Sequence, residues 1–326
     1  MAISRRSTVL GLAAIAARST AQTTAAKAPP RIGFITGAGF PELEQAFTDE
    51  LRRQGLVEGR DVVVVRRFTR ANSDDGRIMG RELANSDLAL VVPSALPLAL
   101  VIREANPRMP MVIGTCPGMV ANGFAQSMEH PGGIYTGIDE LPPGVTARRL
   151  ALLKSVAPAV TRVALLSTTP GPVAHDIQLA DARRAAAELK IETKPYRASS
   201  LEEIESALDA MRADGMNGLQ NFQGGLSLAN RQLIVDYAAA HRLPAVYQAR
   251  AFVAAGGLMA WAPDQSEQLR IAARMAAQIL RGTRPGDIPV VYPPRYALLL
   301  NPRAARELGL EFSAELRRSA EIVGPG

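Results

Sequence analysis

Short apolar runs alternate with amphipathic segments along the chain from residue 31 onward. In the first amphipathic segment, Leu43, Phe47 and Leu51 recur at every fourth position, which is the spacing of one apolar helix face. Gly55 follows this face and is a typical residue at the end of a helix. The apolar runs are shorter than helices usually are and predict strands. In this part of the chain, strands are predicted at residues 31–36, 61–68, 88–94 and 111–115, and helices at 41–55, 74–86 and 96–105.

The same alternation restarts after Pro142. Ser200 and Glu203 form a capping box at the start of one of the helices in this second series. Strands alternating with helices of this length are typical of parallel sheets covered on both faces, so the sequence predicts the α/β class with two doubly wound lobes. The second series has predicted strands at residues 162–168, 191–198, 218–223 and 244–249, and predicted helices at 145–156, 173–190, 200–214 and 228–242.

The remaining pieces are too few for a third domain: strands at 257–262 and 294–301, and helices at 264–282 and 302–309. We therefore expect the chain to cross between the lobes near Ile138, Ala255 and Tyr292. This assigns residues 31–138 and 256–292 to the first lobe, and 139–255 and 293–326 to the second. Such crossovers make a hinged cleft, and ligands of these sheets bind beyond the carboxyl ends of the strands.

The composition is that of a globular protein, with 47% hydrophobic and 21% charged residues. The formal net charge of +6 suggests nucleic-acid binding, but residues 1–28 carry four basic residues and no acidic one. Without them, the 37 basic residues fall to 33, against 31 acidic residues, and no basic cluster stands out. Nucleic acid is therefore not an expected partner, because binding to it needs clustered neutralisation of phosphates.

Residues 1–21 have the pattern of a signal peptide, with a basic start, an apolar stretch from Val9 to Ala17 and a cleavage site expected after Ala21. The apolar stretch is too short to span a bilayer. Residues 22–30 are interpreted as a flexible tether. The pattern predicts export to the periplasm, by the general secretory or the twin-arginine route; an amphipathic N-terminal helix is the alternative interpretation.

Candidate catalytic chemistry is sparse. Cys116 is the single cysteine, so an internal disulfide is excluded, and the three histidines lack metal-ligand spacing, so neither a metal nor a cofactor is expected. Residues 225–229 approximate the G-x-S-x-G elbow of hydrolases around Ser227, but His241, the only later histidine, lies roughly 20 Å away along a helix. Residues 37–42 hold two of the three glycines of a dinucleotide fingerprint, a weak signal. Binding is favoured over catalysis, with a Ser227 hydrolase as a distant alternative.

Four segments of the chain carry a family resemblance: residues 55–65 (GLVEGRDVVVV), 130–139 (HPGGIYTGID), 241–263 and 298–310. In this order and spacing they resemble the periplasmic substrate-binding proteins of ABC importers, in the family that includes tryptophan- and tyrosine-uptake binding proteins. The resemblance runs from about Arg31 to Ile322.

The resemblance implies a type I periplasmic-binding fold, with two lobes that enclose a ligand when they close. It also implies no catalysis by this chain, and permease and ATPase subunits of a membrane transporter as partners. We expect a monomer. A periplasmic sensor that passes a signal to a membrane receptor is the alternative function.

By the same resemblance, Tyr247, Arg250 and Phe252 are expected to face the cleft, and Trp261 to lie near its floor. An aromatic wall suits a flat or apolar solute, and Arg250 could pair with a carboxylate. A core position for the aromatic residues and a salt bridge for Arg250 stay open as alternatives.

Strand ends supply further candidate ligand-binding residues. These are Thr36, Gly37, Ser94, Ala95, Thr115 and Cys116 in the first lobe, and Thr168, Thr169, Asn221 and Gln223 in the second. At three ligand-side positions, residues 95–96, 117–118 and 167–168, the chain departs from its relatives, and the change at 117–118 removes an acidic residue. A carboxylate or a neutral aromatic solute is therefore as good an expectation as an aromatic amino acid.

Overall fold

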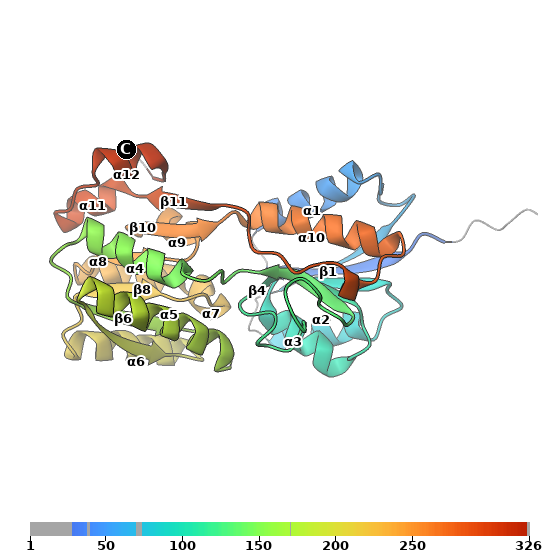
Figure 1. Cartoon of the computed structure of the whole chain (residues 1–326), viewed down its shortest axis with the longest axis horizontal. Coiled ribbons are helices and arrows are strands. Elements are labelled where there is room, and N and C mark those ends of the chain that lie inside the picture. Colours follow the sequence, from blue (N-terminus) through green and yellow to red (C-terminus); the bar gives the residue numbers. More distant parts are fainter. Residues whose placement is uncertain (1–27, 38–39, 70–73, 170, 325–326) are drawn as a thin grey trace, which may run out of the picture.

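The computed structural model describes residues 28–37, 40–69, 74–169 and 171–324 of the chain. The predicted signal peptide and most of the tether lie outside these residues. The described chain forms two lobes, each built around its own sheet, and three extended segments join them (Figure 1). The predicted class, α/β with two lobes, is confirmed.

The first lobe has a five-stranded sheet in the order β2-β1-β3-β4-β5, and every strand pair in it is parallel. Its strands β1, β3 and β4 are buried along most of their length because helices cover both faces, whereas the edge strand β2 carries Arg66 and Arg67. The helices α1 and α10 pack on one face, where Phe34 stacks on Phe47 with ring centroids 4.7 Å apart. The elements are β1 (Arg31–Gly37), α1 (Pro41–Arg53), β2 (Val63–Thr69), α2 (Asp74–Ala84), β3 (Leu90–Pro93), α3 (Leu96–Ala105), β4 (Met111–Cys116), β5 (Tyr135–Asp139) and α10 (Gln265–Leu280).

The second lobe has a seven-stranded sheet in the order β12-β11-β10-β9-β8-β6-β7. All its strand pairs are parallel except β10 with β11. Two apolar clusters fill the spaces between the sheet and the helices on either face. The elements are α4 (Val145–Val156), β6 (Arg162–Ser167), α5 (Val173–Leu189), β7 (Glu192–Arg197), α6 (Leu201–Ala213), β8 (Gly218–Asn221), α7 (Gly225–Ala229), α8 (Arg231–Ala240), β9 (Ala245–Tyr247), α9 (Arg250–Ala254), β10 (Met259–Pro263), β11 (Tyr296–Leu300), α11 (Pro302–Leu308), α12 (Ala314–Ser319) and β12 (Ala320–Ile322).

The second crossover lies later than the sequence predicts. Strand β10 belongs to the second sheet, where it pairs with β9 and β11, so the chain leaves the second lobe after Pro263 rather than near Ala255. The cause is the antiparallel pairing of β10 with β11, a long-range contact that no local pattern signals. Helix α10 then begins behind Asp264, whose side chain accepts a hydrogen bond from the Glu267 N–H, and packs against α1 of the first lobe.

The other two crossovers follow β5 and precede β11. Around the third one, a 3-10 turn (Pro285–Asp287) lies on the first lobe, and the Val290 and Val291 N–H groups donate to carbonyls of that lobe. Within the described residues, none of the helices is long and apolar enough to cross a membrane.

Candidate functional site

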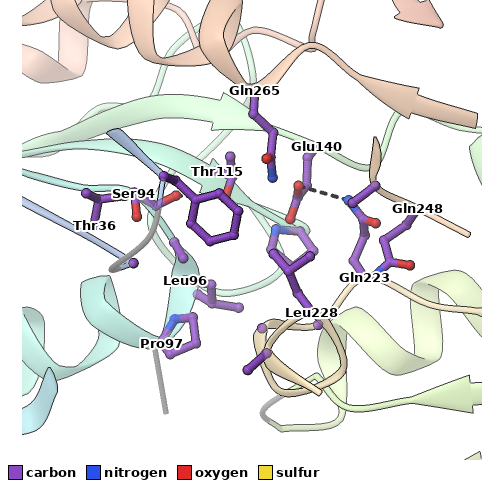
Figure 2. A pocket seen from close by; sticks show the side chains of 18 of the residues that line it. Thr36, Ser94, Leu96, Pro97, Thr115, Glu140, Gln223, Leu228, Gln248 and Gln265 are labelled. Atoms are coloured by element: carbon purple, nitrogen blue, oxygen red, sulfur yellow. Dashed lines mark hydrogen bonds between the residues drawn. The ribbon is translucent and has the colours of Figure 1, made fainter. Parts of the chain in front are cut away.

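A cavity of about 340 Å³ lies between the two lobes, at the carboxyl ends of strands from both sheets. Its volume lies in the range of small-molecule sites. Figure 2 shows its side chains converging from the two lobes and from the connecting segments. The lining residues are Thr36, Gly37, Phe40, Leu43, Thr69, Ser94, Ala95, Leu96, Pro97, Thr115, Pro117, Glu140, Thr169, Gln223, Gly224, Gly225, Leu228, Ala229, Arg231, Gln248, Ala249, Pro263, Gln265 and Leu269.

The first-lobe wall combines an aromatic ring with hydroxyl groups. Phe40 precedes α1 and is half-buried, and its ring lies close to Gly37 at the end of β1. Thr36 is 1% exposed, and its Oγ1 has no hydrogen-bond partner among the described residues. The Thr115 hydroxyl donates to the Ser94 carbonyl over 2.8 Å, which ties the ends of β4 and β3 together. A buried hydroxyl without a partner favours a bound polar group at this wall.

The second-lobe wall is built from amide side chains held by a buried network. Asn221 Nδ2 donates to Gln248 Oε1 over 2.7 Å and to Ser227 Oγ over 3.1 Å. Gln223 is held by its backbone N–H, which donates to Gln178 Oε1 over 2.9 Å. These bonds hold the Gln248 side chain and the Gln223 backbone in place at the wall.

Glu140 connects the two walls. It follows β5 on the first connecting segment, and its Oε2 accepts a hydrogen bond of 2.9 Å from Gln223 Nε2 of the second lobe (Figure 2). Burial, and then the neighbouring Asp139 carboxylate, raise the pKa of Glu140 to about 7, while the Arg149 charge and the Gln223 bond oppose this rise. Among the described residues that line the cavity, Glu140 is the only acidic one.

Asp139 fixes the segment that carries Glu140. Its carboxylate accepts hydrogen bonds from the N–H groups of Gly118 at 3.0 Å, Met119 at 2.9 Å and Leu141 at 3.0 Å. Burial raises the pKa of Asp139, and these three bonds oppose the rise. The side chain therefore joins the loop after β4 to the first crossover.

Seven of the fourteen predicted site residues line this cavity. Three others lie behind its wall: Cys116 is buried, Thr168 Oγ1 accepts a hydrogen bond from the Ser227 N–H, and Asn221 holds Gln248. The seven that line it are Thr36, Gly37, Ser94, Ala95, Thr115, Thr169 and Gln223.

The predicted aromatic wall lies elsewhere. Tyr247 and Phe252 are fully buried in the second lobe and stack on each other with ring centroids 4.7 Å apart, because α9 turns Phe252 back onto the end of β9. Arg250 is half-exposed and forms an ion pair with Glu321. Trp261 packs beside the hinge against Tyr296, with ring centroids 5.9 Å apart. These four predicted residues do not line the cavity, and its aromatic ring comes from Phe40.

Ser227 is a structural hydroxyl in this arrangement. Its Oγ donates to the Gly224 carbonyl over 3.0 Å and accepts from Asn221. Ser227 lies on α7, whereas His241 follows the last residue of α8 and stacks on Tyr237 with ring centroids 4.1 Å apart. Among the described residues, no group of three His, Cys, Asp or Glu side chains could hold a metal ion.

Several lining residues are not among those predicted from the sequence, above all Glu140, Phe40 and Gln248. Glu140 and Gln248 directly follow the short strands β5 and β9. Ligands of such sheets bind at the carboxyl ends of the strands, so both residues stand at positions where binding residues are expected. Residues 135–139 were not predicted as a strand, and the residue after β9 was not predicted to line the cavity, so both were left out.

Comparisons with known proteins agree on the family of the chain. The profile of a family described as "ABC transporter substrate binding protein" matches residues 32–323. A tyrosine-binding protein of Clostridioides difficile is 19% identical over 291 residues, which cover 88% of this chain and 83% of that protein.

Two solved structures have the same fold. One is an ABC domain of Streptococcus pneumonia in complex with L-Trp, with a TM-score of 0.83 and 20% identity, covering 90% of this chain and 99% of the other. The other is a conserved domain protein of Vibrio cholerae, with a TM-score of 0.81 and 21% identity over the same shares of the two chains. These likenesses confirm the expected type I periplasmic-binding fold.

Proposed function

The chain belongs to the family of ABC transporter substrate binding proteins, and on that premise we propose that it captures a small solute between its lobes and delivers it to a membrane importer. The observation that carries this proposal is the cavity of about 340 Å³, whose walls come from both lobes and from the connecting segments. A solute seated there contacts both lobes, so its binding favours their closure.

The partners in this proposal are permease and ATPase subunits, and the chain acts as a monomer. We propose that residues 1–21 direct export and are removed, which places the protein in the periplasm. The mature mass of the exported protein tests this, since cleavage after Ala21 leaves a chain that begins at Gln22.

The cavity wall indicates the kind of solute. Phe40, Leu228 and Leu269 offer apolar surface, and the Thr36 and Thr115 hydroxyls and the Gln223 amide offer polar contacts. Such a wall suits a small molecule with a flat apolar part and a few polar groups. The C. difficile relative is a tyrosine-binding protein and the S. pneumonia structure holds L-Trp, which supports a solute of this size.

Mass spectrometry of small molecules that co-purify with the protein identifies the solute, supported by a thermal-shift screen of amino acids, aromatic acids and aromatic amines. Binding at a hundredfold excess over Kd should raise the free energy of unfolding by about 2.7 kcal/mol. X-ray scattering should show a smaller radius of gyration with the solute bound. A protein that binds none of these compounds, carries none from the cell and keeps one shape would contradict the proposal.

A pair of variants tests whether the solute binds at the first-lobe wall of the cavity. Thr36→Val removes the buried hydroxyl of the cavity wall and should weaken binding of the identified solute, whereas Thr283→Val removes an exposed hydroxyl outside the lining and should not. Equal affinities in the two variants would place the solute away from the first-lobe wall. Delivery is tested by uptake into cells, which should require this chain together with the permease and ATPase genes.

A further inference from the structure

The short helix α7, which follows β8, contains Ser227, a fully buried residue outside the cavity lining. Its backbone is held by Thr168, whose Oγ1 accepts a hydrogen bond from the Ser227 N–H over 3.1 Å. Gly224 makes this approach possible, because a Cβ at that position would lie 2.1 Å from Thr168 Oγ1. These backbone contacts place the Ser227 hydroxyl directly behind the cavity wall.

The Ser227 hydroxyl has a defined direction as a hydrogen-bond donor. Its Oγ donates to the Gly224 carbonyl over 3.0 Å, and a carbonyl oxygen can only accept. Since the hydroxyl has a single hydrogen, its oxygen acts as an acceptor towards Asn221, whose Nδ2 donates to it over 3.1 Å. The backbone carbonyl therefore sets the orientation of the Asn221 amide through the hydroxyl.

Asn221 passes this direction on to Gln248 of the cavity wall. Asn221 Nδ2 also donates to Gln248 Oε1 over 2.7 Å, while Asn221 Oδ1 is buried without a partner among the described residues. Turning the Asn221 amide over would require Gln248 to turn as well, and it would draw the Ser227 hydrogen away from the backbone carbonyl. The observed direction of the network is therefore the favoured one.

The end of the Gln248 amide that remains for the cavity is the nitrogen. Gln248 lines the cavity beside Gln223 on the second-lobe wall (Figure 2). Its Oε1 is taken by Asn221, whereas its Nε2 donates to no described residue and is not sealed inside the wall as Gln223 Oε1 is. A solute in the cavity thus meets N–H donors from Gln248, and an oxygen acceptor is the group that matches them.

We propose that Ser227 is a positioning residue that sets, through Asn221, which end of the Gln248 amide faces the cavity, so that the amide donates to an acceptor oxygen of the solute. Such an oxygen belongs to a carbonyl or a carboxylate group. The assignment of this solute chemistry rests on the proposed function, whereas the direction of the hydrogen bonds from Gly224 to Gln248 does not. The serine of residues 225–229 thereby has a role that requires no nucleophilic attack.

The Ser227 hydroxyl acts on selectivity more than on affinity. While it is present, showing Gln248 Oε1 to the cavity costs a buried hydrogen bond, which disfavours solutes that carry only donor groups. Without it, the Asn221–Gln248 pair keeps its single bond in either direction, and about half of the molecules show each end of the amide. A solute with an acceptor oxygen would then lose about twofold in affinity, and a solute with donors alone would gain about fivefold or more.

The first test needs no solute and uses the unsubstituted protein. NMR of the side-chain amides, with isotope-labelled asparagine and glutamine, measures how fast their hydrogens exchange with water. The Asn221 hydrogens should exchange slowly, because Nδ2 is buried and donates twice. The Gln248 hydrogens, which are open to the cavity, should exchange about tenfold faster or more. Gln248 hydrogens that exchange as slowly as those of Asn221 would overturn the proposal.

Two serine variants separate positioning from a structural role. Ser227→Ala removes the hydroxyl that anchors Asn221 and should speed the exchange of the Asn221 hydrogens about fivefold or more. Ser155→Ala is the matched control, since Ser155 Oγ donates to the Leu152 carbonyl over 2.8 Å but lies on α4, outside the cavity lining. The control should leave the exchange unchanged. Unchanged exchange in Ser227→Ala as well would show that the hydroxyl does not hold Asn221, and the proposal would fail.

The second test compares three probes that share one ring. Indole-3-propionic acid carries a carboxylate, indole-3-propionamide an uncharged carbonyl, and tryptamine an ammonium group without an acceptor. By calorimetry, Ser227→Ala should lower the affinity for the acid and the amide about twofold and raise that for tryptamine about fivefold or more, whereas Ser155→Ala should change neither. The tighter binder of acid and amide identifies the kind of acceptor oxygen. An unchanged ratio of acid to tryptamine affinity in Ser227→Ala would contradict the proposal.

Gln248→Glu replaces the amide nitrogen by an oxygen of similar size and keeps an acceptor for Asn221. It should weaken binding of the acid and the amide about tenfold or more, because an oxygen of the wall then faces the oxygen of the solute. Equal affinities in this variant, or no binding of either probe to the unsubstituted protein up to millimolar concentration, would overturn the assignment of an acceptor oxygen. The amide exchange decides the role of Ser227 separately, and the co-purification experiment decides whether the chain binds a solute at all.

Discussion

Replacing Glu140 by glutamine should stabilise the solute-free protein at pH 8 and change its stability little at pH 5. Burial raises the pKa of this carboxyl from its ordinary value of 4.5 to about 7, so the folded protein holds a proton that the unfolded chain releases. A raised carboxyl pKa contributes stability below the unfolded value of 4.5, and this stability is lost as the pH rises toward 7. Glutamine resembles the protonated form at every pH and avoids the loss.

The size of the effect follows from the two pKa values. A shift from 4.5 to about 7 corresponds to about 3 kcal/mol at pH 8. Glu140 is only partly shielded from solvent, and screening reduces the expected gain to about 2 kcal/mol. At pH 5 most of the carboxyl is already protonated in the folded protein, so the gain falls below about 1 kcal/mol.

Urea unfolding of the unsubstituted protein and of Glu140→Gln at pH 5 and pH 8 measures this difference directly. The comparison requires that the unfolding free energies of the two proteins depend equally steeply on urea concentration. Glu129→Gln is the matched control, because Glu129 is exposed and should show no pH-dependent gain. Equal effects of Glu140→Gln at the two pH values, or a loss of stability at pH 8, would refute the electrostatic account of the site.

Three other substitutions test packing, the ion pair and a helix cap. Gly257→Ala places a Cβ 2.6 Å from Tyr247 Cε2 and should lower the free energy of unfolding by about 2 kcal/mol, measured in urea. Arg250→Ala breaks an exposed ion pair with Glu321, so it should cost less than about 1 kcal/mol in urea and leave the affinity of the co-purifying solute unchanged by calorimetry. Asn301→Ala removes the side chain that caps α11 and should lower the unfolding free energy by about 1 kcal/mol, which thermal unfolding can detect.

Local patterns were enough for most of the fold, because parallel strands covered on both faces are continuous apolar runs. The strands β1 and β3 are buried along almost all of their length, and their sequences stand out for that reason. The second crossover could not be found in the same way. Residues Met259–Pro263 are as apolar as a strand of either lobe, and only the pairing of β10 with β9 and β11 assigns them to the second sheet.

The candidate site was predictable where backbone geometry alone decides it. Thr36, Thr115 and Gln223 follow from the rule that carboxyl ends of parallel strands meet at one edge. The positions of the aromatic side chains could not be predicted from this rule, because the orientation of a ring depends on tertiary packing. Tyr247 and Phe252 stack inside the second lobe, although their sequence neighbourhood resembles that of cleft residues in relatives.

The position of Glu140 links the ionisation of the cavity to the motion of the lobes. Its bond to Gln223 joins the first connecting segment to the second lobe, so in the proposed function a separation of the lobes that moves Gln223 away would break that bond and expose the carboxylate to water. Burial is the largest cause of its raised pKa, and exposure therefore lowers the pKa toward the ordinary value. By linkage, a proton on Glu140 then favours the closed arrangement. Closure of the lobes in the proposed function should therefore be more favourable below about pH 7, where Glu140 keeps its proton, and X-ray scattering of the solute-free protein against pH checks this.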